Sequence, residues 1–97
     1  MSDISDRILD ENIMKLQKIL HKNRIRILYR LNEKETCTCE LVEELDIANN
    51  LMSHHLKVLT DLGLIEGRDE GLHRKYSIAP SHKKYVCKLL TCLPIYS

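Results

Sequence analysis

The chain has 97 residues, which is enough for one small domain, and its formal net charge at pH 7 is +1. Trp and Phe are absent and aromatic residues make up 4% of the chain, so aliphatic residues must fill the core. This composition favours helices over a sandwich or barrel. Because the chain is nearly neutral, nucleic-acid binding would have to rest on local patches of charge.

Several classes of protein are not expected from this sequence. No stretch approaches the ~20 apolar residues of a membrane span, and the N-terminal MSDISDRILDEN is acidic and unlike a signal peptide. We therefore expect a cytoplasmic protein with no membrane partner, in which thiols are kept reduced. An enzyme is not expected, because there is no Gly-rich phosphate loop and no nucleophile–base pair at a supporting spacing.

Periodic apolar residues predict two helices in the first third of the chain. The first covers about residues 5–20, where Ile and Leu recur at roughly helical intervals. The second lies in RIRILYRL, where Ile25, Leu28 and Leu31 form a buried stripe. The arginines of this second helix are expected to stay outside.

Two shorter helices are predicted after the polar segment NEKET. The first covers about residues 39–45, and Thr38 is placed to cap its N-terminus. The second ends near Leu62, because Gly63 supplies a C-terminal stop.

The apolar period then changes from helical to alternating. Residues 64–68 and 72–78 are predicted to be strands, joined by a turn at residues 69–71. After Pro80, a last helix is predicted over about residues 81–95. The expected fold is mostly α with a small β-hairpin (α+β). Four helices, two strands and a final helix form a single domain over residues 1–97.

Two short helices with a tight turn, followed by a hairpin, are typical of a winged helix-turn-helix. The helix-turn-helix covers about residues 38–62 and the wing about residues 64–78. In such a pair the second helix enters the DNA major groove, where Asn, Ser, His and Lys can contact base edges. Basic wing residues would contact phosphate or the minor groove. The predicted DNA-binding residues are Asn49, Asn50, Ser53, His54, Lys57, Arg68, His73, Arg74 and Lys75.

The segments TCTCELVEEL, NNLMSHHLKVLTDLGLIEGR and GLHRKYSI resemble the ArsR/SmtB family of metal- and stress-responsive transcriptional repressors. The resemblance covers essentially the whole chain and includes the pattern S-x-H-L-x-x-L-x-x-x-G-L. It implies double-stranded operator DNA as a partner and a homodimer built on the first and last helices. Apolar stripes on those helices are expected to form the interface, and they include Ile8, Leu16, Leu89 and Leu93.

The sequence departs from the family at the start of the predicted recognition helix. The family commonly has Ser or Thr there, and this chain has Ala48. Asp46 or Asn49 is therefore expected to cap the helix.

The pair Cys37 and Cys39 falls where the family carries a sensor motif for thiophilic ions such as arsenite, antimonite, cadmium and lead. Soft thiolates select such ions. Residues i and i+2 of a regular helix point about 200° apart and cannot share one ion. Cys37 is expected outside the helix and Cys39 in its first turn, so the two thiols could converge if that turn unwinds. The helix N-terminus is expected to lower the thiol pKa. A third ligand could come from Cys87, from Cys92 or from solvent. If they are not ligands, the two cysteines would pack as small apolar residues.

These features predict a homodimeric repressor that a thiophilic metal or metalloid bound at Cys37 and Cys39 releases from its operator. No constitutive cofactor is expected. Two alternatives stay open on the sequence alone. One is a repressor that responds to thiol oxidation, and the other is a winged-helix module that binds a protein partner.

Overall fold

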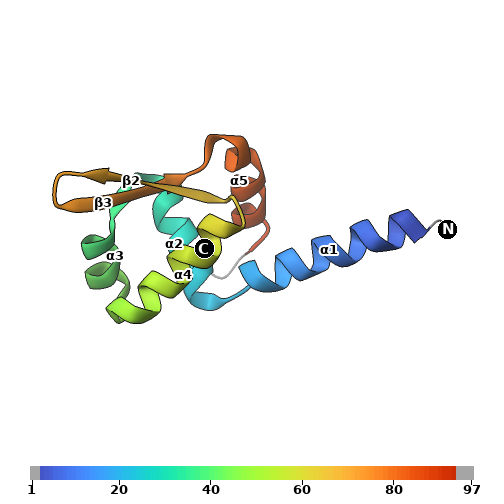
Figure 1. The fold of residues 1–97 in the computed structure, drawn as a ribbon, viewed down its shortest axis with the longest axis horizontal. Coiled ribbons are helices and arrows are strands. Elements are labelled where there is room, and N and C mark those ends of the chain that lie inside the picture. The colour runs from blue at the N-terminus through green and yellow to red at the C-terminus, as the bar shows by residue number, and fades with distance from the viewer. Residues whose placement is uncertain (1–2, 94–97) are drawn as a thin grey trace.

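The computed structural model describes residues 3–93 and has the predicted mostly helical fold with a small antiparallel sheet. In Figure 1 the elements follow in the order α1 (Asp3–Ile19), α2 (Lys22–Glu33), β1 (Thr36–Cys37), α3 (Thr38–Leu45), α4 (Asn49–Asp61), β2 (Ile65–Glu70), β3 (His73–Ile78), the short 3-10 helix η1 (Pro80–His82) and α5 (Lys83–Thr91). No helix in this part of the chain is both long and apolar enough to cross a membrane.

Helix α2 lies at the centre and packs against α3, α4, α5 and β3. Its predicted stripe of Ile25, Leu28 and Leu31 is buried, and Ile27 is buried as well. Each such side chain contributes roughly 1.5–3 kcal/mol when fully buried. Together with α4, this helix therefore provides the rigid support on which the site residues stand.

The three arginines of α2 are half-buried, so the prediction that they stay outside was wrong. Arg24 donates to the Lys18 carbonyl oxygen at 2.7 Å, and Arg26 donates to the Leu45 carbonyl oxygen at 2.7 Å. Arg30 pairs with Glu44 at 2.6 Å. Each guanidinium therefore ties α2 to a neighbouring segment while its aliphatic stem covers apolar surface.

The sheet contains a strand that the sequence did not reveal. The order is β1-β3-β2, and β1 pairs antiparallel with β3, with Thr36 opposite Tyr76 and Cys37 opposite Lys75. Two residues are too few to show an alternating pattern, so only the pairing identifies this strand. It joins the segment before α3 directly to the wing.

The predicted turn at residues 69–71 was wrong by two residues. Asp69 and Glu70 belong to β2, where they pair with Arg74 and His73, and the hairpin turns at residues 71–72. Gly71 has φ +65°. A two-residue hairpin turn needs positive φ at its first central position, and Gly adopts that conformation most easily.

The predicted helix caps were also wrong. Thr38 is the first residue of α3, and its hydroxyl donates to the Arg74 carbonyl oxygen of β3 at 3.4 Å. Asp46 ends α3 in the left-handed conformation with φ 53°, and Asn49 lies in the first turn of α4. Among residues 3–93, no side chain caps α4, which follows Ala48.

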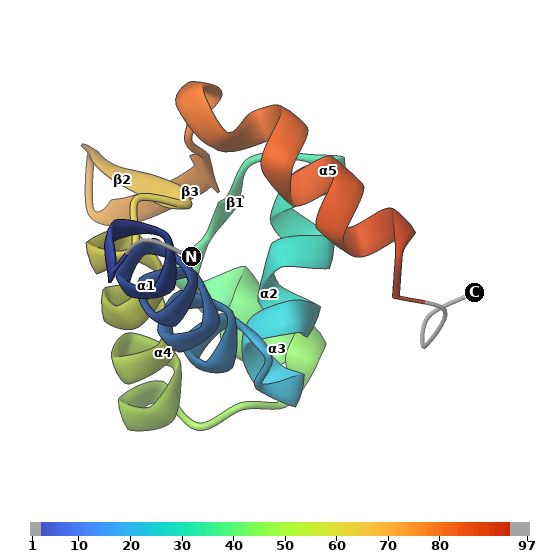
Figure 2. The same cartoon turned by 90° about the vertical axis from the view of Figure 1, so that its right-hand side faces the viewer.

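Helix α1 extends as an arm from the body of the molecule, as Figure 1 shows, and Figure 2 looks nearly along its axis. Four apolar side chains on it are 44–59% exposed: Ile8, Leu9, Ile13 and Met14. At the other end of the chain, η1 takes up the start of the predicted last helix, and Pro80 stands in its first turn, where a missing N–H is tolerated. Residues 94 and 95 of that prediction lie outside the described part.

Candidate functional site

Helix α4 separates its side chains onto two faces. Met52, Leu56 and Leu59 are buried, together with His55. The predicted base-reading and phosphate-contacting residues of this helix all lie on the exposed side: Asn49, Asn50, Ser53, His54 and Lys57. This outer face is short and polar, so it can approach base edges without steric obstruction.

His55 anchors α4 to the junction of α1 and α2. Its side chain is only 3% exposed, and its Nδ1 accepts a hydrogen bond from Arg24 Nε at 3.2 Å. The His21 ring lies 4.7 Å away, centroid to centroid. Burial lowers the pKa of His55, and the nearby His21, Arg24 and His54 lower it further. The neutral form of this imidazole is therefore favoured on the buried side of α4.

The wing carries the predicted basic residues, but each guanidinium or ammonium has an acidic neighbour. Arg68 pairs with Glu35 and with Glu70, the latter at 3.0 Å. Lys75 also contacts Glu70, at 3.3 Å. The Arg68 guanidinium holds the pKa of the Glu70 carboxyl below its usual range. A DNA phosphate would have to compete with these carboxylates.

Arg74 bridges the wing and the groove beside α4. It pairs with Asp69 at 2.8 Å, and its Nε donates to Tyr76 Oη at 3.2 Å. Ser53 and Lys57 of α4 line the same groove as Arg74. The outer face of α4 and the wing therefore form one continuous surface with basic groups on both sides.

The thiols of Cys37 and Cys39 lie 2.8 Å apart, Sγ to Sγ, at the start of α3. Cys37 lies outside the helix and Cys39 in its first turn, as expected, and the thiols meet with that turn intact. Cys37 precedes the helix with extended backbone, φ −82° and ψ 158°, so helical spacing does not apply to the pair. Cys37 is buried and Cys39 is exposed. The pair is reachable from solvent on one side only.

Two further side chains lie beside the thiols. Cys37 Sγ donates to Glu40 Oε1 at 3.1 Å, and Cys39 Sγ lies 4.0 Å from His73 Nδ1 of the wing. The hydrogen bond with Cys39 raises the pKa of the Cys37 thiol, and this outweighs the lowering effect of the Glu40 backbone N–H. The expected lowering of the thiol pKa by the helix N-terminus was therefore wrong for Cys37.

The other two cysteines lie elsewhere. Cys87 and Cys92 are exposed and belong to the α5 end of the chain, which Figure 1 shows well separated from α3. Within one chain the structure does not bring them to Cys37 and Cys39. Among residues 3–93, no three His, Cys, Asp or Glu side chains stand ready as a metal site.

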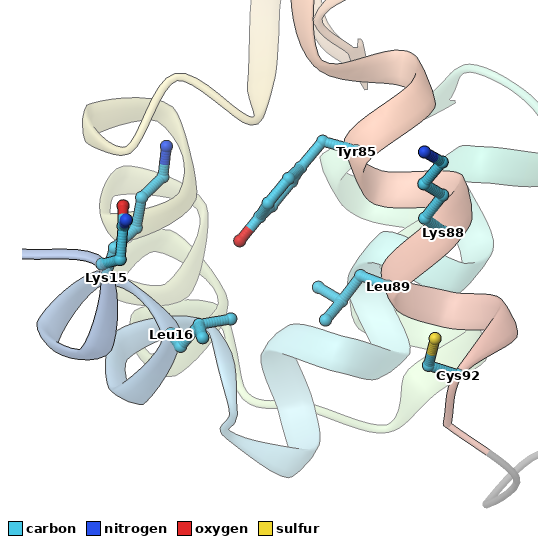
Figure 3. Close-up of a pocket in the computed structure, with 7 residues that line it drawn as sticks. Lys15, Leu16, Tyr85, Lys88, Leu89 and Cys92 are labelled. Atoms are coloured by element: carbon cyan, nitrogen blue, oxygen red, sulfur yellow. The ribbon is translucent and has the colours of Figure 1, made fainter. Parts of the chain in front are cut away.

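Helices α1 and α5 face each other across an apolar groove, shown in Figure 3. Leu16 on α1 and Leu89 on α5 point into it, and both are half-buried. The Lys15 ammonium lies 5.5 Å from the centre of the Tyr85 ring. Of the other residues predicted for the dimer interface, Ile8 is 54% exposed and Leu93 is half-buried.

Comparison with known proteins identifies the family. Residues 21–66 match the model of the bacterial regulatory proteins of the arsR family. The chain is 30% identical over 71 residues to an arsenical resistance operon repressor of Staphylococcus xylosus, covering 73% of this chain and 68% of that protein. It is 36% identical over 62 residues to a cadmium resistance transcriptional regulatory protein CadC homolog of Staphylococcus aureus, covering 63% of this chain and 51% of that protein.

The fold agrees with these matches. The transcriptional regulator HlyU from Vibrio vulnificus superposes with a TM-score of 0.75 at 25% identity, covering 96% of this chain and 99% of that one. The helix pair α3–α4, the wing and the sequence pattern of α4 all occur in one chain. This chain therefore belongs to the arsR family of winged-helix, DNA-binding transcriptional regulators.

Proposed function

We propose that the chain is a homodimeric repressor that binds operator DNA and is released when a thiophilic metal or metalloid binds Cys37 and Cys39. The observation that carries the proposal is the 2.8 Å separation of the two thiols at the start of α3. Relatives named for arsenical and cadmium resistance support an ion of this kind. Soft thiolate ligands favour these ions over hard ones.

The position of the pair supplies a route from ion to DNA. Cys37 lies in β1, which is hydrogen-bonded to β3 of the wing, and Cys39 lies in the first turn of α3, which packs against α4. Thiolates on a tetrahedral ion with bonds of about 2.3 Å stand about 3.8 Å apart. The pair must therefore open by about 1 Å when it binds such an ion, and release from DNA requires part of this motion to reach β1 or α3. Since binding free energies are reciprocal, DNA must weaken ion binding by the same factor.

The dimer rests on the apolar surface of α1. Exposed Ile8, Leu9, Ile13 and Met14 form a stripe that a second copy can cover. A patch of this kind on a small soluble domain is typical of an interaction site, and closed twofold pairs are the commonest oligomers. A dimer would place two recognition helices on one palindromic site.

The experiment is an anisotropy titration of labelled DNA taken from upstream of the gene, with the wild-type chain and the double variant Cys37→Ser/Cys39→Ser. Both proteins should bind the duplex with nearly equal affinity, because neither thiol lies on the outer face of α4. Arsenite or cadmium should release only the wild type, since a hydroxyl is a poor partner for a soft ion. Release of the double variant at the same ion concentration would show that the sensor lies elsewhere. Absence of sequence-preferring, salt-dependent binding by the wild type would favour a protein-interaction module instead.

A second candidate is regulation by thiol oxidation, which the same close contact favours. Cys37 and Cys39 would lose two protons and two electrons to a peroxide or a disulfide oxidant and form one sulfur–sulfur bond. The oxidised chain should then be 2 Da lighter, and dithiothreitol should restore both its mass and its DNA binding. If peroxide leaves the mass and the DNA affinity unchanged while cadmium releases the DNA, the chain senses an ion.

A further inference from the structure

We propose that His73 of the wing is a third ligand to the ion at Cys37 and Cys39, so that ion binding draws the wing onto the start of α3. The inference rests on the proposed function and names the donor set and the ion class of that same site. It differs from the prediction made from the sequence, in which a third ligand came from a cysteine of the last helix or from solvent.

The pairing of β1 with β3 places His73 beside the thiols. Thr36 lies opposite Tyr76 and Cys37 opposite Lys75. The ladder ends at Cys37, and Cys39 in the first turn of α3 comes near His73, which lies two residues before Lys75 on β3. The Thr38 hydroxyl donates to the Arg74 carbonyl oxygen, which holds the two segments together at the intermediate position. The β1–β3 pairing and this hydrogen bond therefore hold the backbone of the start of α3 close to the start of β3.

A small adjustment would bring His73 to ligand distance from Cys39. Cys39 Sγ lies 4.0 Å from His73 Nδ1. Ligands on tetrahedral zinc, with Zn–S of about 2.3 Å and Zn–N of about 2.0 Å, stand about 3.5 Å apart. His73 must therefore approach by about half an ångström while the two sulfurs separate by about 1 Å. Both Cys39 and His73 are exposed, so their side chains can make this adjustment.

Glu40 supplies a possible fourth donor, because its Oε1 already lies 3.1 Å from Cys37 Sγ. The resulting set contains two thiolates, one imidazole and one carboxylate. Such mixed donors suit divalent ions of the zinc and cadmium type. Arsenite would use the two thiolates alone. The site therefore favours a divalent ion that has affinity for both sulfur and nitrogen.

The arrangement also explains how ion binding would alter the DNA-binding surface. His73 begins β3, directly after the turn of the wing at residues 71–72. An imidazole that coordinates an ion through Nδ1 is fixed at the start of α3, and this sets the direction of its remaining Nε2–H. Coordination would thus reposition one wing contact and move the tip of the hairpin at the same time.

The test uses the full chain and the probes Co²⁺, Cd²⁺ and arsenite, with His73→Gln compared against His82→Gln as a matched histidine replacement on η1. The Co²⁺ complex of the wild type should show sulfur-to-metal charge transfer and the visible bands of a four-coordinate ion. His73→Gln should weaken Co²⁺ and Cd²⁺ binding by at least the 10- to 100-fold that a lost supporting ligand costs and should change the visible bands. Arsenite binding should be the same in all three proteins.

A direct measurement avoids reliance on the variant. In wild-type chain carrying ¹⁵N-labelled histidine, Cd²⁺ should shift the Nδ1 resonance of His73, and arsenite should leave it in place. An unchanged His73 resonance, or equal Cd²⁺ affinity and equal Co²⁺ spectra in wild type and His73→Gln, would overturn the role of His73 and leave the proposed function intact. Failure of the wild type to bind any of these ions would overturn both.

Discussion

Glu35 and Arg68 form an ion pair that joins the segment before β1 to the middle of strand β2 in the wing. They are 33 residues apart in the chain. Glu35 stands two residues before Cys37, and Arg68 is a predicted phosphate contact. The pair therefore links the thiol segment to the charge that the wing can offer to DNA.

Replacing the carboxylate should release that charge. We expect Glu35→Gln to tighten binding to any duplex by a few-fold, in line with the modest strength of exposed ion pairs. It should also steepen the dependence of log affinity on log salt by about one unit, because one more phosphate would be neutralised. Glu43→Gln, with the same change of charge on α3, serves as the control. Equal effects of the two variants in salt-dependent anisotropy would mean that only net charge matters.

Substitutions of base-reading and of phosphate-contacting residues should have different effects on DNA binding. Lys57→Ala and Arg68→Ala should weaken binding to all sequences and reduce the salt slope by about one unit each. Asn50→Ala and His54→Ala should instead lower the preference for the operator over a scrambled duplex, by about 1–3 kcal/mol where a base pair is contacted. Competition titrations at several salt concentrations measure both quantities. Identical behaviour of the four variants would contradict the assignment of roles on this surface.

If α1 forms the dimer interface, a charge placed in its apolar stripe should prevent dimerisation. Ile13→Glu would place a carboxylate in the apolar stripe, and burying an unpaired charge costs far more than the interface can supply there. This variant should sediment as a monomer at micromolar concentration, where the wild type sediments as a dimer. Gln17→Glu on an exposed position of the same helix is the matched control. A wild-type chain that sediments as a monomer would rule out the interface.

Acid should destabilise the fold through His55. Its pKa is lowered in the folded chain, so between the folded and the unfolded pKa the unfolded chain binds more protons. Stability is therefore complete above the unfolded pKa of about 6.5 and falls as the pH drops below it. The charged or titratable groups that face this ring are His21, Arg24 and His54. Urea unfolding at pH 7.5, 6 and 5 should show the loss in the wild type and a smaller loss in His55→Gln. Parallel pH dependences would assign the effect to other groups.

The sequence by itself determined the helices and the identity of the site. Apolar residues at helical spacing located α2 and α4, and Gly63 marked the end of α4, where it has φ +78°. The pattern of α4 predicted a recognition helix, and TCTCEL supplied the two cysteines that we propose as the sensor. These features are local, because a helix repeats every 3.6 residues and a cap or stop acts within one turn.

Only the tertiary structure decided which distant groups meet. Strand β1 exists because residues 36–37 pair with β3, and that pairing brings His73 to Cys39 across 34 positions of sequence. The Glu35–Arg68 pair and the neutral His55 beside Arg24 depend equally on packing between separate elements. The thiol contact also required it, because the extended backbone of Cys37 comes from its place in the sheet. Local spacing carries no information about such contacts, since their geometry depends on how the elements pack in three dimensions.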